Sequence, residues 1–219
     1  MLSSDTLKFL KELKKNNNKP WFEANRKRYE NAQNEIKDFI TGWINMLGKK
    51  DPSIAQLDPK KCLFRIHRDV RFSSDKSPYK NNLGAYLSKG GKSGSNAGYY
   101  LHIEPGNCFF GAGYYMPLPE DLQKIRQEID YNFGDFKKII HSKKFKDSFG
   151  DLTTESKLKR PPKGYDEHNE AIEYIKLKGF TVFKKLDDDF FLSKDIVRNS
   201  TELCLLSKPF VDFLNAAIE

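Results

Sequence analysis

Residues 99–116 of this chain read YYLHIEPGNCFFGAGYYM, and this stretch decides the fold. Residues 99–104 are rich in aromatic and β-branched side chains, which favour an extended strand. Pro105-Gly106-Asn107 is a cluster of turn-forming residues, and residues 108–116 resume the strand composition. Two strands joined by so short a turn predict a β-hairpin. The stretch therefore predicts an antiparallel sheet at the centre of the protein.

The segments on either side of the hairpin alternate between helical and extended patterns. Apolar residues at a period of two predict further strands at residues 62–72, 83–88 and 180–183, with a short strand within residues 152–160. Helical periods and cap residues predict helices from Ser3 or Ser4 to about residue 16, and at residues 20–47, 122–129, 136–140, 168–175 and 195–217. This order predicts an α+β fold, in which N-terminal and C-terminal helices pack on a central antiparallel sheet. The 219 residues fit one domain, 1–219.

Composition indicates a soluble protein with a basic character. Charged residues make up 31% of the chain and the net charge is +8. The apolar runs are shorter than the roughly 20 residues that a membrane span needs. The N-terminus lacks the pattern of an export signal, and the three cysteines are unclustered, which is typical of reduced thiols. We expect a cytoplasmic protein without a membrane partner.

The surplus positive charge lies in one segment. Residues 60–92 contain nine lysines and arginines against Asp69 and Asp75, a net charge of +7 out of +8 for the whole chain. The centre of this segment, residues 64–80, reads FRIHRDVRFSSDKSPYK. A charge so concentrated predicts a site for an anionic partner.

Five cations of this run form the predicted anion site. A planar guanidinium suits two-point contact with phosphate or carboxylate, and a lysine adds a point charge. Asp69 and Asp75 would orient the guanidinium groups, and the strand pattern turns Arg68 towards the apolar face. Two alternatives stay open: an ion-pair network on an exposed sheet face, and binding to an acidic partner protein. The predicted anion-binding residues are Arg65, Arg68, Arg71, Lys76 and Lys80.

Several motifs, in order, resemble one known family. They are Pro20–Asn25 with Tyr29, the run 64–80, Gly98–Gly106, Gly111 with Gly113 and Tyr115-Met116-Pro117, Pro162–Tyr165, and Leu177–Phe180. The chain is similar in these motifs to the family called domain of unknown function 2461, which is widespread in bacteria. The resemblance spans nearly the full chain and implies a bacterial protein with a single domain, but no activity. His67 stands where that family often has an aromatic residue, which argues against His67 as a base or a metal ligand.

Six residues are candidates for the lining of a pocket. Gly111 and Gly113 fall on one strand face and leave room for a ligand or for a large neighbour such as Trp21 or Tyr29. Tyr79 either stacks on a ligand or closes its loop over the core. The remaining candidates are Tyr100 in the hairpin, and Asn25 and Arg28, which lie beside a stretch that carries the family resemblance.

The titratable groups nearest this predicted surface are His102, Glu104 and Asp69. His102 and Glu104 share a strand face, so they are the first candidates for acid–base catalysis. With His67 and Asp69 they also offer metal-ligand chemistry, but no spacing is diagnostic of a metal. Gly91-Lys92-Ser93 lacks the first glycine of a phosphate-binding loop, because Tyr86 stands there. The sequence predicts no cofactor and no metal.

Two functions fit these residues. The first is binding of a phosphorylated or other anionic small molecule, or a nucleotide, in an Arg/Lys pocket on the sheet. The second is a non-catalytic nucleic-acid-binding module that uses the same basic and aromatic surface. The dependence of affinity on salt separates them, because each phosphate contact adds to its steepness. The sequence leaves the reaction, if any, and the oligomeric state undetermined.

Overall fold

The computed structural model describes residues 1–219. It has ten helices and four strands. The helices are α1 (Ser4–Lys15), α2 (Lys19–Ala24), α3 (Arg26–Leu47), α4 (Pro59–Cys62), α5 (Pro119–Tyr131), α6 (Phe133–Ile140), α7 (Lys143–Phe149), α8 (Ile172–Ile175), α9 (Asp188–Leu192) and α10 (Ile196–Ile218). The strands are β1 (Leu83–Leu87), β2 (Gly98–Ile103), β3 (Cys108–Tyr114) and β4 (Phe180–Leu186), with a 3-10 turn at Gly91–Ser93. None of the helices combines the length and apolar character needed to cross a membrane.

The four strands form one antiparallel sheet in the order β1-β2-β3-β4. The predicted hairpin is confirmed as β2 and β3. Its turn is closed by the amide of Asn107, which donates to the carbonyl of Glu104 at 2.7 Å. Gly106 takes a φ of +82° there, which favours glycine. The predicted strand at residues 180–183 is confirmed and extends to Leu186.

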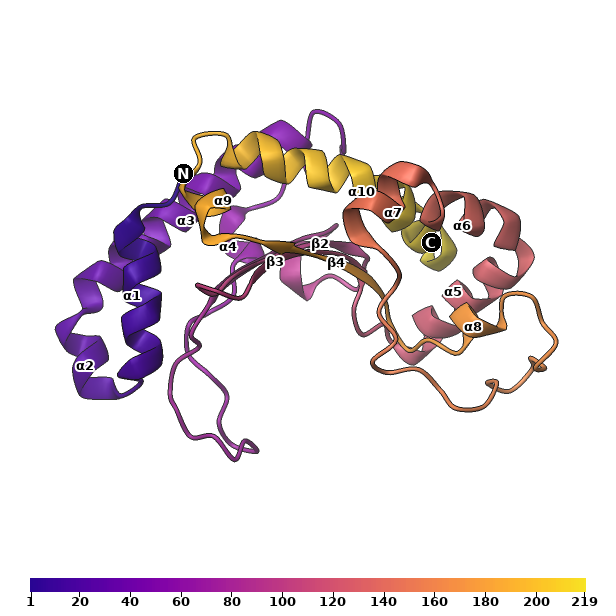
Figure 1. The fold of residues 1–219 in the computed structure, drawn as a ribbon, viewed down its shortest axis with the longest axis horizontal. Helices are drawn as coiled ribbons and strands as arrows, with labels where there is room; N and C mark the ends of the chain where they lie inside the picture. Colours follow the sequence, from indigo (N-terminus) through magenta and orange to yellow (C-terminus); the bar gives the residue numbers. More distant parts are fainter.

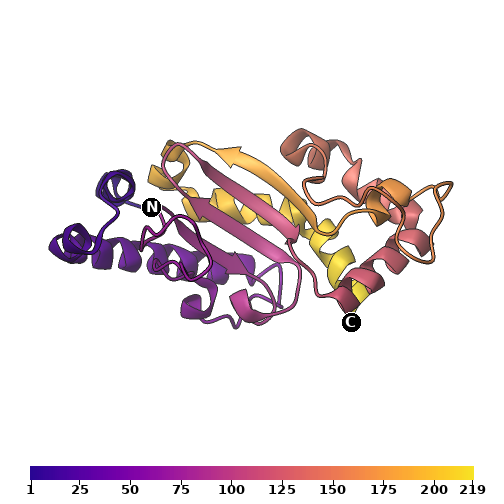
Figure 2. The ribbon, with the colours of Figure 1, turned by 90° about the horizontal axis from the view of Figure 1, so that it is seen from below.

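Helices cover one face of this sheet and leave the other uncovered by helices. α3 and α10 run side by side along the covered face (Figure 1), where Trp43, Tyr99, Phe110 and Phe210 are fully buried. Figure 2 shows the opposite face from below, with no helix in front of the strands. We call this the open face. The predicted α+β class, with N-terminal and C-terminal helices on an antiparallel sheet, is confirmed.

The predicted strand at residues 62–72 is wrong. Cys62 ends α4, and residues 64–80 form a long loop that projects from the open side of the sheet (Figure 1). We call residues 64–80 the basic arm. Only two isolated bridges form here: Leu63, just before the arm, pairs with Ala85 of β1, and His67 pairs with Tyr79 within the arm. Too few ladder hydrogen bonds are made for a strand, although the alternation of apolar residues looks like one.

Other predicted boundaries also change. The helix expected at residues 20–47 is divided at Asn25, whose side-chain amide donates to the carbonyl of Trp21 at 2.9 Å. The helix expected at 168–175 is reduced to α8, and residues 152–160 contain no strand. The first helix begins as predicted, since the Ser3 hydroxyl accepts from the amide of Thr6 at 3.2 Å.

Candidate functional site

The open face carries a row of aromatic side chains. Successive side chains on a strand point to opposite faces, so β2 buries Tyr99 in the core and presents Tyr100 and His102 on the open face. Their cross-strand neighbours follow from the register: Tyr86 beside Tyr100, and Phe109 opposite His102. The remaining open-face side chains come from β4 and are Thr181, Phe183 and Lys185. The alternation of side chains along the strands therefore also places these residues together on one face.

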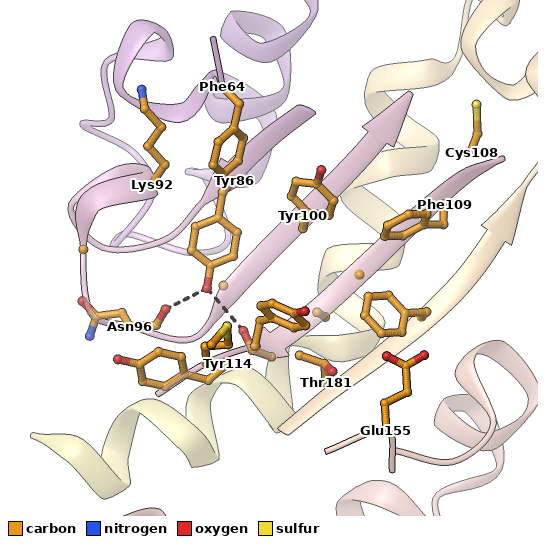
Figure 3. A pocket seen from close by; sticks show the side chains of 18 of the residues that line it. Phe64, Tyr86, Lys92, Asn96, Tyr100, Cys108, Phe109, Tyr114, Glu155 and Thr181 are labelled. Carbon is orange, nitrogen blue, oxygen red and sulfur yellow. Dashed lines mark hydrogen bonds between the residues drawn. The ribbon is translucent and has the colours of Figure 1, made fainter. Parts of the chain in front are cut away.

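A pocket of about 810 Å³ lies on this face (Figure 3). Its volume is within the range of small-molecule sites. Phe64, from the base of the basic arm, lines the pocket, and so does Glu155, from the loop before β4. Tyr100, Phe109 and Phe183 also line it, and half of all the lining residues are hydrophobic. The pocket is therefore a depression lined by apolar and polar residues in equal number, with these two loops along part of its border.

Gly111 and Gly113 both line the pocket, and glycine fits each position for a different reason. A Cβ on Gly111 would lie 3.0 Å from Cε1 of Phe183, so the space above Gly111 is taken by that ring. Phe183, and not Trp21 or Tyr29, is thus the large neighbour. Gly113 has a φ of +117°, and a Cβ there would lie 2.0 Å from the carbonyl oxygen of Phe180. Gly113 is therefore required by the backbone.

A chain of polar contacts leads from the pocket to the molecular surface. The hydroxyl of Tyr100 lies 2.9 Å from Nδ1 of His102, and the side-chain amide of Asn82 lies 3.4 Å from the same nitrogen. Nε2 of His102 lies 3.5 Å from Glu104 Oε2, and Glu104 Oε1 accepts from Lys14 Nζ at 2.9 Å. The tautomer with its proton on Nε2 satisfies all these contacts, because Nδ1 then accepts from Tyr100 or Asn82 and Nε2 faces the carboxylate.

Burial sets the protonation states along this chain. It lowers the pKa of His102 and outweighs the opposing effect of Glu104, so the imidazole is neutral. It raises the pKa of Tyr100 to about 12. Burial would also raise the pKa of Glu104, but hydrogen bonds from Lys14 and Asn107 hold it below its usual value. The chain thus consists of a phenol, a neutral imidazole and a carboxylate.

Two further residues with hydroxyl groups, Tyr86 and Thr181, line the pocket. Tyr86 donates its hydroxyl to the carbonyl of Asn96 at 2.7 Å and lies 3.3 Å from the carbonyl of Gly113 (Figure 3). Thr181 Oγ1 is buried and has no hydrogen-bond partner. Buried polar atoms are nearly always paired. The Thr181 hydroxyl is thus free to bond a polar atom of a ligand.

Cations outnumber acids at the pocket. Lys92, Lys185 and Glu155 are its charged lining residues. Lys92 Nζ lies 3.3 Å from the carbonyl of Lys60, and neither lysine takes part in an ion pair. The pocket therefore has one more positive than negative charge.

Three predicted anion-binding residues are engaged within the basic arm itself. Arg68 donates to Asp75 and Ser77, and this pairing lowers the pKa of Asp75 to about 2. Arg71 pairs with Asp69 at 2.6 Å, and Lys76 Nζ donates to the carbonyl of Val70 at 3.0 Å. The structure does not bring these three cations together at the pocket; their partners belong to the arm.

The other two predicted cations, Arg65 and Lys80, lie near the pocket edge. Lys80 Nζ lies 5.3 Å from the ring centroid of Phe64, which lines the pocket. Burial, and then the charge of Arg65, lower the pKa of Lys80. Neither cation takes part in an ion pair. The two like charges therefore stand together at the base of the arm without an acid.

The remaining candidates lie outside the pocket. Tyr79 is buried and stacks on Phe22, with ring centroids 3.9 Å apart. His67 packs against the same two rings, as an aromatic residue would. Asn25 caps the break between α2 and α3, and Arg28 pairs with Glu12 and Asp5. Cys108, by contrast, lines the pocket, but it is a buried thiol, and burial raises its pKa to about 12. No three or more His, Cys, Asp or Glu side chains converge as a metal site would require.

Sequence reasoning missed five open-face residues. These are Tyr86, Phe109, Thr181, Phe183 and Lys185. The alternation along FTVFKK, residues 180–185, could have placed Thr181, Phe183 and Lys185 on one face. Which face stays open depends on where the helices pack, and no local pattern encodes that.

Comparison with known proteins gives one match. No curated protein and no solved structure matches the chain. One family model, described as "Conserved hypothetical protein (DUF2461)", matches residues 5–213. The protein therefore belongs to the family of conserved hypothetical proteins known as DUF2461, and the predicted resemblance is confirmed.

Proposed function

We propose that this protein binds a small anionic molecule with a planar ring, such as a nucleotide or another phosphorylated compound, in the pocket of the open face. The observation that carries the proposal is the row of Tyr100, Phe109 and Phe183 beside the unpaired Lys185. Planar rings stack on aromatic side chains, and a lysine holds a phosphate as a point charge. We further propose a cytoplasmic location, supported by three free cysteines.

Each part of the pocket has a place in this proposal. The aromatic row holds the ring, while the free hydroxyl of Thr181 bonds a polar atom at its edge. Lys185 holds the anion beside Phe109, and Arg65 and Lys80 extend the positive potential along one border. The Tyr100–His102–Glu104 chain places a proton donor and acceptor beside the bound ring.

The test is a titration with adenosine 5′-monophosphate and, separately, inorganic phosphate, followed by calorimetry. Replacing Phe183 by alanine removes one stacking partner and weakens nucleotide binding by about 1–3 kcal/mol, roughly 5- to 150-fold. Leu205→Ala is the matched control, because Leu205 is 37% exposed against 39% for Phe183 but lies on α10. Lys185→Ala weakens both probes, whereas Lys184→Ala, on the opposite strand face, does not.

Two results would contradict the proposal. One is equal loss of affinity in Phe183→Ala and Leu205→Ala. The other is binding of no ring-bearing anion from a panel of purine and pyrimidine mononucleotides at millimolar concentration.

The alternative is a nucleic-acid-binding module without catalysis. Exposed aromatic side chains on an open antiparallel sheet favour it, because single-stranded nucleic acids stack on such faces. A mononucleotide pocket predicts a shallow dependence of affinity on salt. Contacts of a single strand through several phosphates predict that log affinity falls by about 0.7 per phosphate for each unit rise in log salt concentration.

A further inference from the structure

The tip of the basic arm exposes an aromatic side chain. Phe72 is 97% exposed, more than any other large apolar residue of the chain. The guanidinium carbon of Arg71 lies 5.9 Å from its ring centroid. A single exposed apolar residue is ordinary on its own, so the meaning of Phe72 depends on the loop that carries it.

That loop is held in place at its base and along its length. The amide of Arg68 donates to the carbonyl of Pro78 at 3.0 Å, and the amide of Lys80 donates to the carbonyl of Ile66 at 2.7 Å. The Arg68 side chain ties the two sides of the arm together through Asp75 and Ser77. The arm thus projects on the open side of the sheet and is held together by its own hydrogen bonds, with Phe72 at its tip (Figure 1).

A line of cations joins this tip to the pocket. Lys76 is exposed near the tip, while Arg65 and Lys80 stand at the base without an acidic partner. Lys80 lies over Phe64, which belongs to both the arm and the pocket. Cations without an acidic partner therefore lie between Phe72 at the tip and Phe64 at the pocket. Two aromatic side chains with cations between them match the bases and phosphates of an extended nucleic-acid strand.

We propose that the arm and the pocket together bind single-stranded nucleic acid. One base stacks in the pocket, the phosphates next to it lie along Lys80, Arg65 and Lys76, and a further base packs on Phe72. This inference rests on the proposed function, because the pocket base is the planar ring of that proposal. Paired bases are stacked inside a duplex, so their faces are not available to the pocket.

The charges of the arm favour a polyanion over a lipid surface. A membrane-bound surface needs a contiguous apolar area in addition to positive charge. Phe72 is instead flanked by Arg71 and by Ser73 and Ser74. Preferential binding to anionic vesicles is therefore the result that would contradict a nucleic-acid partner.

The experiment uses fluorescence anisotropy with the full chain and labelled oligouridine and oligothymidine of 4, 8 and 12 nucleotides, together with a duplex. We expect the 12-mers to bind at least tenfold more tightly than adenosine 5′-monophosphate. Oligouridine and oligothymidine differ in the 2′-hydroxyl and in the 5-methyl group of thymine, so the ratio of their affinities shows which of the two strands is preferred. Phe72→Ala should weaken the 12-mer about 5- to 150-fold and leave mononucleotide binding unchanged.

Matched variants separate the arm from general effects. Tyr131→Ala removes an aromatic side chain that is 74% exposed on α5 and should leave the affinity unchanged. The double variant Arg65→Ala/Lys80→Ala should lower the salt slope by about 1.4, the effect of two phosphate contacts. Lys143→Ala/Lys144→Ala removes the same charge from α7 and should not change the slope.

The outcomes distinguish the two proposals. If mononucleotides bind in the pocket but 12-mers bind no more tightly and ignore Phe72, the strand inference is overturned and the proposed function stands. If 12-mers bind without responding to Phe183→Ala, the strand inference fails, and if mononucleotide binding also does not respond to Phe183→Ala, both proposals fail. Equal affinity for duplex and single strands, or binding of the arm to phosphatidylserine vesicles in preference to the 12-mers, also overturns the inference.

Discussion

Gly111 and Gly113 lie two residues apart on β3, and replacing each by alanine separates a requirement for space from a requirement of the backbone. At Gly113 the φ of +117° costs an L-residue about 1–3 kcal/mol. The new Cβ would also lie 2.0 Å from the carbonyl oxygen of Phe180, so β3 and β4 must move apart. Each ladder hydrogen bond lost costs about 1 kcal/mol net. We therefore expect Gly113→Ala to lower the free energy of unfolding by at least about 3 kcal/mol.

At Gly111 the same substitution meets only a side chain. The new Cβ would lie 3.0 Å from the ring of Phe183, and that ring is partly exposed and can rotate. We expect a loss below about 1 kcal/mol. Domains of ordinary stability have about 5–15 kcal/mol in total, so the two variants should differ clearly.

Urea unfolding followed by circular dichroism measures both free energies at a fixed temperature. A change in midpoint with an unchanged slope reports stability alone. The reasoning is refuted if Gly113→Ala unfolds within about 1 kcal/mol of the wild type, or if Gly111→Ala is equally damaging.

Three further predictions concern titratable groups. Burial lowers the pKa of His102, so below about pH 6.5 the unfolded chain binds more protons than the folded chain, and the free energy of unfolding falls as the pH drops. His102→Gln should therefore lose less stability than the wild type between pH 7.5 and 5 in urea titrations. An equal loss in both proteins would contradict the assignment. Asp75 has a pKa of about 2 because Arg68 donates to it, so Arg68→Ala should raise that pKa towards its ordinary value in a carboxyl NMR titration. The stabilisation from this pair is present above about pH 4 and is lost as the pH falls towards 2. An unchanged pKa in Arg68→Ala would show that the pair does not form. All three thiols are buried, and burial raises the pKa of Cys62 to about 11. Ellman's reagent should therefore label fewer than one thiol per native chain and all three thiols in urea. Rapid labelling of the native chain would show that the thiols are not buried.

The hairpin and the C-terminal helix were predictable because their signals are local. Residues 105–107 have turn chemistry that selects a hairpin whatever surrounds them. The helix expected at residues 195–217 is α10, shifted by one residue, since Ile196, Phe210 and Leu214 repeat on one face over many turns.

The basic arm was not predictable for a physical reason. Its alternation of Phe64, Ile66, Val70 and Phe72 has the period of a strand. Only Ile66 is buried, however, while Phe64 and Phe72 are exposed. A strand needs a partner along its length, but the first half of the arm pairs with the second half through a single bridge, between His67 and Tyr79. The period of a sequence cannot reveal that its partner is absent.

The site was predictable only in part. Tyr100 and His102 follow from strand alternation within β2, Glu104 comes directly after that strand, and the structure places the three in one chain of contacts. The approach of Lys14 to Glu104 joins residues 90 positions apart, and no local pattern encodes such a contact. The position of Phe183 over Gly111 likewise depends on the pairing of β3 with β4.

The two loops that border the pocket also occupy the outer edges of the sheet. The amide of Phe64 donates to the carbonyl of Gly84 on β1 at 3.0 Å, and the amide of Thr153 donates to the carbonyl of Thr181 on β4 at 2.9 Å. Unpaired edge strands recruit other chains and promote aggregation. Shortening either loop to widen the pocket would therefore expose a hydrogen-bonding edge, so the solubility of this protein and access to its open face are linked through the same backbone contacts.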